Sequence, residues 1–147
     1  LTNKDEKFLT KLGATSVIKR DSFNYSKNPL SKQKWQGAID TVGGEILSTI
    51  LAETMYDGIV VSTGLAKSAT LNTTVYPFIL RNITLSGIDC VYASYTKRVN
   101  AWKFLEKYLD KRILKNIKVS KSFNDLHDIS NQILKGEIRG RTLIKVI

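Results

Sequence analysis

The sequence predicts an α/β fold built on a parallel sheet. Its three clearest strands are short runs of small apolar residues, 37–42, 58–64 and 83–89. Continuous apolar runs of this kind are typical of strands that are buried on both faces. Helical patterns separate them, and a strand, helix, strand, helix, strand order favours crossover connections and therefore parallel pairing.

The first part of the chain is expected to hold one helix and one short strand. Residues 4–12 have acidic residues in the first turn and an apolar face, and Gly13 is a natural helix end. Residues 16–18 (Ser-Val-Ile) indicate a short strand. Residues 21–34 are polar and are expected to form a loop.

The middle of the chain holds two strand–helix units. The apolar run 37–42 ends in a Gly-Gly pair, and the helix expected over 45–55 has apolar residues at helical spacing. The run 58–64 predicts the second strand. A short helix over 73–80, limited by a proline, leads to the third strand over 83–89.

The last third predicts two helices and a closing strand. A basic amphipathic helix is expected from residue 96 to about 112, with its apolar side buried against the sheet. A second helix is expected over 124–135, with Asn124 as its N-cap and Gly136 at its end. Residues 141–147 indicate a strand.

The charge of the chain points to anionic ligands. Its formal net charge is +10, and such a surface attracts phosphates, whether in nucleic acid, anionic lipid, phosphorylated cofactors or coenzyme A. Residues 96–121 hold nine Lys or Arg, so a basic module that binds nucleic acid is the alternative class. We expect no exposed aromatic residues among these charges and find no nucleic-acid-binding motif, which counts against that alternative.

Cysteine and histidine are too few for several kinds of site. Cys90 is the one cysteine, which excludes an internal disulfide and favours the cytoplasm. A lone cysteine that ends an apolar strand is typically a small buried hydrophobe, so a nucleophilic pair of Cys90 and His127 is disfavoured. His127 is the one histidine, and zinc needs more ligands, so no metal site is expected.

No membrane or secretion signal is evident. No apolar run approaches the roughly 20 residues of a membrane-spanning helix. The N-terminus lacks the apolar core of a signal peptide. Because the chain starts at Leu1 rather than at Met, we expect it to be part of a longer protein.

Glycine-containing turns follow all three predicted strands, at 42–44, 63–66 and 87–90. Ligands of open α/β sheets bind beyond the carboxyl ends of the strands, and glycine lets the backbone approach them. One such turn is compatible with a tight connection alone, but three in register predict a binding crevice. The chain contains no G-x-G-x-x-G fingerprint, so these residues alone do not identify the ligand.

Four segments together resemble one known family: 8–14 (FLTKLGA), 35–44 (WQGAIDTVGG), 77–89 (PFILRNITLSGID) and 140–146 (GRTLIKV). It is the acrylyl-CoA reductase-like, or quinone-oxidoreductase-like, branch of the zinc-free medium-chain dehydrogenase/reductase superfamily. The resemblance covers essentially the whole chain. In that family a catalytic domain, the first Rossmann strand, the glycine-rich loop and the second strand precede the region that this chain resembles.

The resemblance implies a partial Rossmann fold, a doubly wound parallel sheet that lacks its first two strands. Residues 1–110 would be the remainder of the NADP-binding domain, and residues 111–147 a segment that returns to the missing catalytic domain. The strand over 37–42 would then be an open apolar edge, and we expect the isolated chain not to be a stable monomer.

The resemblance also implies contacts to the cofactor NADP. Arg20 would help to hold the 2′-phosphate, Leu65 would lie beside the nicotinamide, and Ile79 would be an apolar wall. Cys90 stands where the family commonly has Ser, and Glu137 is a weaker match. A solvated charge is the alternative for Arg20, and plain core for Ile79. Relatives often have Gly-Gly where this chain has Lys67-Ser68.

The implied activity is that of a cytoplasmic reductase. The intact protein would transfer a hydride from NADPH to an activated double bond of a small molecule, an enoyl-CoA thioester or a quinone-like enone. We expect a homo-oligomer without nucleic-acid or membrane partners. The catalytic groups would lie in the missing domain, so no catalytic residue is assigned and the chain alone is expected to be inactive.

Overall fold

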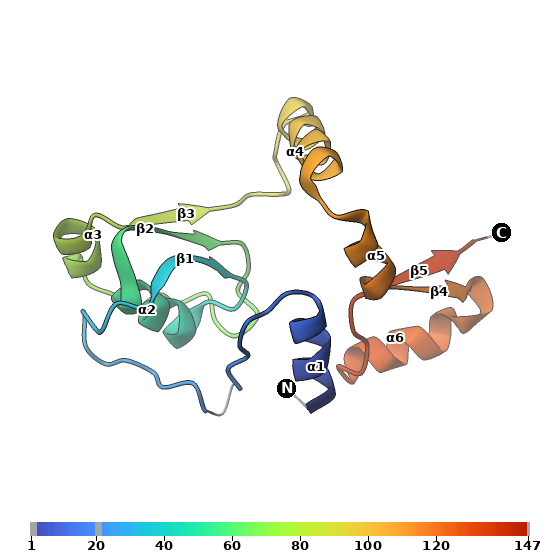
Figure 1. Cartoon of the computed structure of the whole chain (residues 1–147), viewed down its shortest axis with the longest axis horizontal. Coiled ribbons are helices and arrows are strands. Elements are labelled where there is room, and N and C mark those ends of the chain that lie inside the picture. Colours follow the sequence, from blue (N-terminus) through green and yellow to red (C-terminus); the bar gives the residue numbers. More distant parts are fainter. Residues whose placement is uncertain (1–2, 20–21, 147) are drawn as a thin grey trace. The chain divides into compact units, whose positions relative to one another are not determined.

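The computed structural model of the protein describes residues 3–19 and 22–146. The chain divides into two compact units, one comprising Ile18–Ser94 and the other Leu1–Val17 with Tyr95–Ile147. The functional boundary expected at residue 110 stays a prediction. Each unit is described by itself below, and Figure 1 labels their helices and strands.

The first unit is a three-stranded parallel sheet with crossover helices (Figure 1). Strands β1 (Trp35–Asp40), β2 (Thr54–Ser62) and β3 (Thr84–Gly87) lie in the order β1-β2-β3. Helix α2 (Gly44–Glu53) connects the first two strands and α3 (Tyr76–Arg81) the last two. The predicted parallel α/β fold is therefore confirmed, although β2 begins four residues before the expected start at 58.

The core of this unit lies on one face of the sheet. Leu47 and Leu51 of α2 pack with Val60 of β2. Successive side chains of a strand alternate between faces, so Ile39 and Ile59 point away from this core. They are 77% and 48% exposed. The expectation that these strands are buried on both faces is therefore wrong, because an apolar run does not reveal how many faces of the sheet are covered.

Arg81 of α3 holds the C-terminal end of α2. Its guanidinium donates hydrogen bonds of 2.8, 3.1 and 2.6 Å to the backbone carbonyls of Ala52, Thr54 and Ser31. The last carbonyls of a helix have no partner within the helix, so the arginine satisfies groups that would otherwise need water. It thereby joins α3, α2 and the loop before β1.

Residues 16–18 form no strand, so that prediction is wrong. A strand needs a hydrogen-bonded neighbour, and in the described part of the chain the sheet ends at β1 with no strand beyond it. The loop predicted after this segment is confirmed over residues 23–34.

The second unit is mostly helical and holds a two-stranded parallel sheet. Strands β4 (Lys118–Ser122) and β5 (Arg141–Lys145) pair along their whole length. Asp5 of α1 forms a salt bridge of 3.0 Å with Arg139 before β5. The helices of this unit are α1 (Asn3–Lys11), α4 (Tyr95–Tyr108), α5 (Lys111–Ile117), the 3₁₀ helix η2 (Phe123–Asp125) and α6 (Leu126–Leu134).

Two helix starts differ from the predictions. The single helix expected from 96 to about 112 is divided, because Asp110 accepts a hydrogen bond of 2.8 Å from the Arg112 N–H and caps α5. Asn124 is not an N-cap. Ser122 takes this role instead, in a capping box with Asp125.

Helix α4 has no buried residue. Trp102 and Leu105, two residues of its predicted apolar side, are 71% and 42% exposed, so the expected burial of that side is wrong. Phe104, elsewhere on the helix, is 63% exposed. Exposed aromatic residues therefore do stand among the lysines of α4, and their expected absence no longer argues against nucleic-acid binding.

In the described part of the chain, no helix has the length and apolar character needed to cross a membrane.

Candidate functional site

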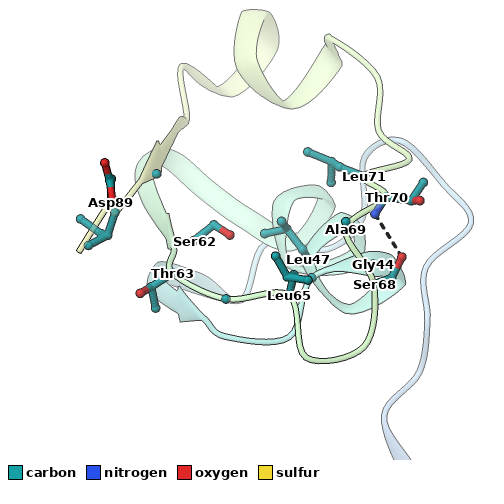
Figure 2. Close-up of a pocket in the computed structure, with 14 residues that line it drawn as sticks. Gly44, Leu47, Ser62, Thr63, Leu65, Ser68, Ala69, Thr70, Leu71 and Asp89 are labelled. Atoms are coloured by element: carbon teal, nitrogen blue, oxygen red, sulfur yellow. Dashed lines mark hydrogen bonds between the residues drawn. The ribbon is translucent and has the colours of Figure 1, made fainter. Parts of the chain in front are cut away.

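A cavity of about 560 Å³ lies at the carboxyl ends of the three parallel strands of the first unit (Figure 2). It occupies the place where the glycine-containing turns predict a crevice. The turn after each strand contributes to its wall, and so does the segment that follows β2. The lining residues are Gly43, Gly44, Leu47, Ser62, Thr63, Gly64, Leu65, Ser68, Ala69, Thr70, Leu71, Gly87, Ile88 and Asp89.

Asp40, the last residue of β1, fixes the first turn. Its side chain is buried and accepts hydrogen bonds from the N–H groups of Val42 (3.2 Å) and Gly43 (3.0 and 3.1 Å) and from the Ser62 hydroxyl (3.4 Å). Gly43 has φ 71° and ψ −163°, a conformation that is essentially restricted to glycine. Asp40 was not among the predicted site residues; the clue to it in the sequence is a charged residue within an apolar run that leads to Gly-Gly.

The turn after β2 packs directly against the turn after β1. A Cβ atom on Gly64 would lie 2.6 Å from the Thr41 carbonyl oxygen, so only glycine fits there. The N–H groups of Lys67 and Ser68 donate to the Val42 carbonyl at 2.9 and 3.3 Å. The backbone beside the cavity is therefore held by hydrogen bonds between two strand ends.

Lys67 anchors the outer part of this loop. Its Nζ atom lies 3.3 Å from the Tyr25 hydroxyl, 3.4 Å from a carboxylate oxygen of Glu45 and 4.7 Å from the centre of the Tyr25 ring. The pKa of Lys67 is raised, mainly by the hydrogen bond to Tyr25; burial opposes this, and the hydrogen bond to Glu45 adds a smaller increase. A Gly-Gly loop, as expected in relatives, could not form these contacts.

The residues assigned by resemblance are not all brought together. Leu65 lines the cavity and is 65% exposed. Ile79 of α3 is 68% exposed and lies outside the lining, so the alternative that it belongs to the core is wrong. Cys90 is exposed and follows the last lining residue directly, so it is not the buried hydrophobe that was expected. Glu137 is exposed and belongs to the other unit, and Arg20 lies outside the described residues.

Metal-ligating side chains are not clustered in the described part of the chain. No group of three or more His, Cys, Asp or Glu residues there could hold a metal ion. His127, on α6, is exposed. The cavity is instead lined by backbone, hydroxyl and aliphatic groups and by one acid, Asp89.

The chain matches no family model. It is nevertheless similar to curated reductases. It is 42% identical over 139 residues to a probable acrylyl-CoA reductase, AcuI, of Escherichia coli K12. The aligned region covers 95% of this chain and 43% of that protein. It is 38% identical over 140 residues to the acrylyl-CoA reductase AcuI of Ruegeria pomeroyi, with 95% and 42% covered. The chain thus spans less than half the length of these relatives.

Solved structures of related oxidoreductases are similar to this chain as well. The YhdH oxidoreductase of Salmonella enterica in complex with NADP superimposes with a TM-score of 0.91 at 38% identity, over 99% of this chain and 45% of that one. The Bacillus subtilis protein YhfP with NAD bound gives a TM-score of 0.91 at 36% identity and the same coverage. This chain therefore belongs to the acrylyl-CoA reductase-like, quinone-oxidoreductase-like branch of the medium-chain dehydrogenase/reductase superfamily, and corresponds to the C-terminal part of its members.

Proposed function

We propose that this chain provides the nicotinamide-binding side of an NADPH-dependent reductase. The complete protein would transfer a hydride from NADPH to an activated double bond of an enoyl-CoA thioester or a quinone-like enone. The observation that carries this proposal is the cavity at the carboxyl ends of three parallel strands, where α/β sheets bind their ligands. Because the chain spans less than half of its relatives, the activity of the whole protein is part of the proposal.

The cavity fits a flat heterocycle. Its volume of about 560 Å³ falls within the range of about 300–1,000 Å³ that is typical of small-molecule sites. A Cβ atom on Gly87 would meet no protein atom within 4 Å, so the missing side chain leaves open space at the wall. Leu47, Leu65 and Leu71 offer apolar surface for a ring, and Thr63 offers a hydroxyl for a carboxamide.

NADP is favoured as the cofactor by two related structures. The Salmonella YhdH structure contains NADP, and an Escherichia coli YhdH structure, 40% identical with a TM-score of 0.89, contains NADPH. When bound, NADPH supplies the hydride, and the protein orients it. Within this chain, Leu65 would contact the nicotinamide, with Ile79, Cys90 and Glu137 as further contacts and Arg20 at the 2′-phosphate.

The relatives named acrylyl-CoA reductase and putative quinone oxidoreductase support the proposed substrate class. A CoA thioester agrees with the net charge of +10, which attracts the phosphates of coenzyme A. We place the protein in the cytoplasm, as a homo-oligomer without nucleic-acid partners. Its catalytic groups would come from outside this chain.

A nuclear magnetic resonance titration of the 147-residue chain with NADPH tests the proposal. We expect weak binding that shifts the amide signals of Gly43, Gly64 and Gly87, and no reductase turnover, because the chain contains no G-x-G-x-x-G loop to hold the pyrophosphate. A Gly87→Leu variant should weaken binding by filling the cavity. Signals that do not shift, or that shift only outside the cavity, would refute the assignment, and micromolar binding would refute the need for that loop.

A further inference from the structure

A buried acid stands directly behind the wall of the cavity. Asp40 is 2% exposed, and its carboxylate accepts the four hydrogen bonds described above. Two of its partners, Gly43 and Ser62, line the cavity. The carboxylate is therefore separated from the ligand space by one layer of backbone and hydroxyl groups.

The partners of this carboxylate are all electrically neutral. It forms no salt bridge with any side chain in the described part of the chain. Its hydrogen-bond partners in the described structure are N–H and O–H groups, which are the donors that a carboxylate needs. Burying a charge without a counterion is costly, and a buried charge acts over a longer range because water screens it less.

We propose that Asp40 tunes the redox balance of a nicotinamide bound in the cavity by favouring its oxidised form. This inference rests on the proposed function. Loss of a hydride, one proton with two electrons, converts the neutral reduced ring into a cation, and the acceptor double bond takes that hydride. A fixed negative charge attracts the cation and has much less effect on the neutral ring. Tighter binding of the oxidised form makes hydride donation more favourable.

A purely structural role is the competing explanation, because Asp40 also holds the Gly43 turn. An Asp40→Asn substitution separates the two. The Oδ1 atom of asparagine can still accept from the N–H groups of Val42 and Gly43, and its amide can donate to the Ser62 hydroxyl, which accepts as well as donates. The shape and three of the four hydrogen bonds are kept while the charge is removed; the 3.0 Å bond from the Gly43 N–H to the second carboxylate oxygen is lost, because an amide nitrogen cannot accept it. Asp40 does not reach the ligand itself, so it is a positioning residue rather than a catalytic one.

The probes are nicotinamide mononucleotide and its reduced form, which carry the same phosphate and differ in the charge of the ring. Their dissociation constants for the 147-residue chain are measured from amide shifts, which report weak binding. The quantity compared is the dissociation constant of the reduced probe divided by that of the oxidised probe. We expect this ratio to fall about fivefold or more in Asp40→Asn. Glu53→Gln is the matched control, because Glu53 is also a buried acid but lies at the opposite end of α2 and is paired with Lys34. Its ratio should equal that of the parent chain.

Each outcome has one meaning. A ratio that is unchanged in Asp40→Asn, with both probes weakened equally, overturns the tuning role and leaves the proposed function standing. If neither probe binds the parent chain, the proposed function fails and this inference with it. If the Asn variant does not fold, the parent chain decides the matter with benzamide mononucleotide, a neutral analogue of the oxidised probe. Equal affinity for the neutral and cationic rings overturns the inference. A preference for the cation that persists in Asp89→Asn, which neutralises the acid that lines the cavity, supports it, and a preference that disappears in that variant overturns it.

Discussion

Gly43 lies directly against the backbone of Ser68, with which it forms a parallel bridge. A Cβ atom on Gly43 would overlap the Ser68 carbonyl oxygen, which is backbone and cannot rotate away. Gly43→Ala should therefore lower the free energy of unfolding by about 2 kcal/mol or more, from the disfavoured φ together with the displaced loop. Urea unfolding followed by circular dichroism measures the loss.

Gly44→Ala is the control for this substitution. Gly44 also has a positive φ, 62°, but its nearest neighbour is the Cβ atom of Ser68 at 3.1 Å, in a short side chain beside the loop. We expect a smaller loss of about 1 kcal/mol, mainly from backbone strain. Equal losses at the two glycines would show that the contact with the Ser68 carbonyl has no energetic importance.

Arg81→Lys should destabilise the first unit although the charge is kept. Lysine cannot span the three carbonyl groups that the guanidinium reaches, so some of them lose their partner. We expect the free energy of unfolding to fall by about 2 kcal/mol. Arg112→Lys is the control, because Arg112 is 89% exposed in a surface pair with Asp110 and should change stability little. Similar effects at both arginines would contradict the role of Arg81.

The capping box before α6 should depend on pH. Hydrogen bonds from the backbone N–H and then the hydroxyl of Ser122 lower the pKa of Asp125 below its ordinary value of 3.8. A lowered pKa in the folded state means that the stabilisation is complete above pH 3.8 and is lost as the pH falls through the folded-state pKa. Asp125→Asn should therefore weaken the hydrogen-exchange protection of α6 at neutral pH and not in strong acid. A deficit that is the same at all pH values would contradict this.

Association of the chain should depend on β1, which is an edge strand in the described part of the sheet. Edge strands pair with other chains, and a lysine on such a strand opposes this pairing. Ile39→Lys should reduce the concentration-dependent association that we expect in analytical ultracentrifugation. Leu134→Lys, at an exposed apolar residue of α6, should leave it unchanged. A parent chain that remains monomeric at all concentrations would refute the prediction.

Arg20→Ala tests whether Arg20 binds the 2′-phosphate of NADP. The loss of a charge-assisted hydrogen bond of roughly 1.5–3 kcal/mol should weaken binding of adenosine 2′,5′-bisphosphate about tenfold or more, and binding of adenosine 5′-monophosphate little. Amide shifts measure both affinities. Equal changes for the two nucleotides would remove Arg20 from this role.

The strands and the helix around the cavity were predictable because their sequence pattern is local. Apolar runs that end in glycine located β1, β2 and β3, and helical spacing located α2. Strand β4 was not predictable, because Lys-Val-Ser-Lys-Ser carries little apolar character and all its residues are exposed. It forms through pairing with β5, about 20 residues later, which no local pattern reveals.

The cavity could be located from sequence, but not its supporting residues. Asp40 follows the same apolar run that predicted β1, and its role depends on a partner 22 residues away, Ser62. The exposure of Ile79 and Trp102 was missed for a related reason, since an apolar face indicates what a helix could pack against and not whether that partner is present.

Helix α4 has a further consequence for handling the protein. A helix with no buried residue opens locally at little free-energy cost, because few contacts are lost with it. It carries exposed lysines and an arginine at 97, 98, 103 and 107, the residues after which trypsin cleaves. Brief digestion should therefore cut the chain within α4 before it reaches the sheet of the first unit. Peptide mass mapping of such a digest would show which part of the chain survives as a protease-resistant domain.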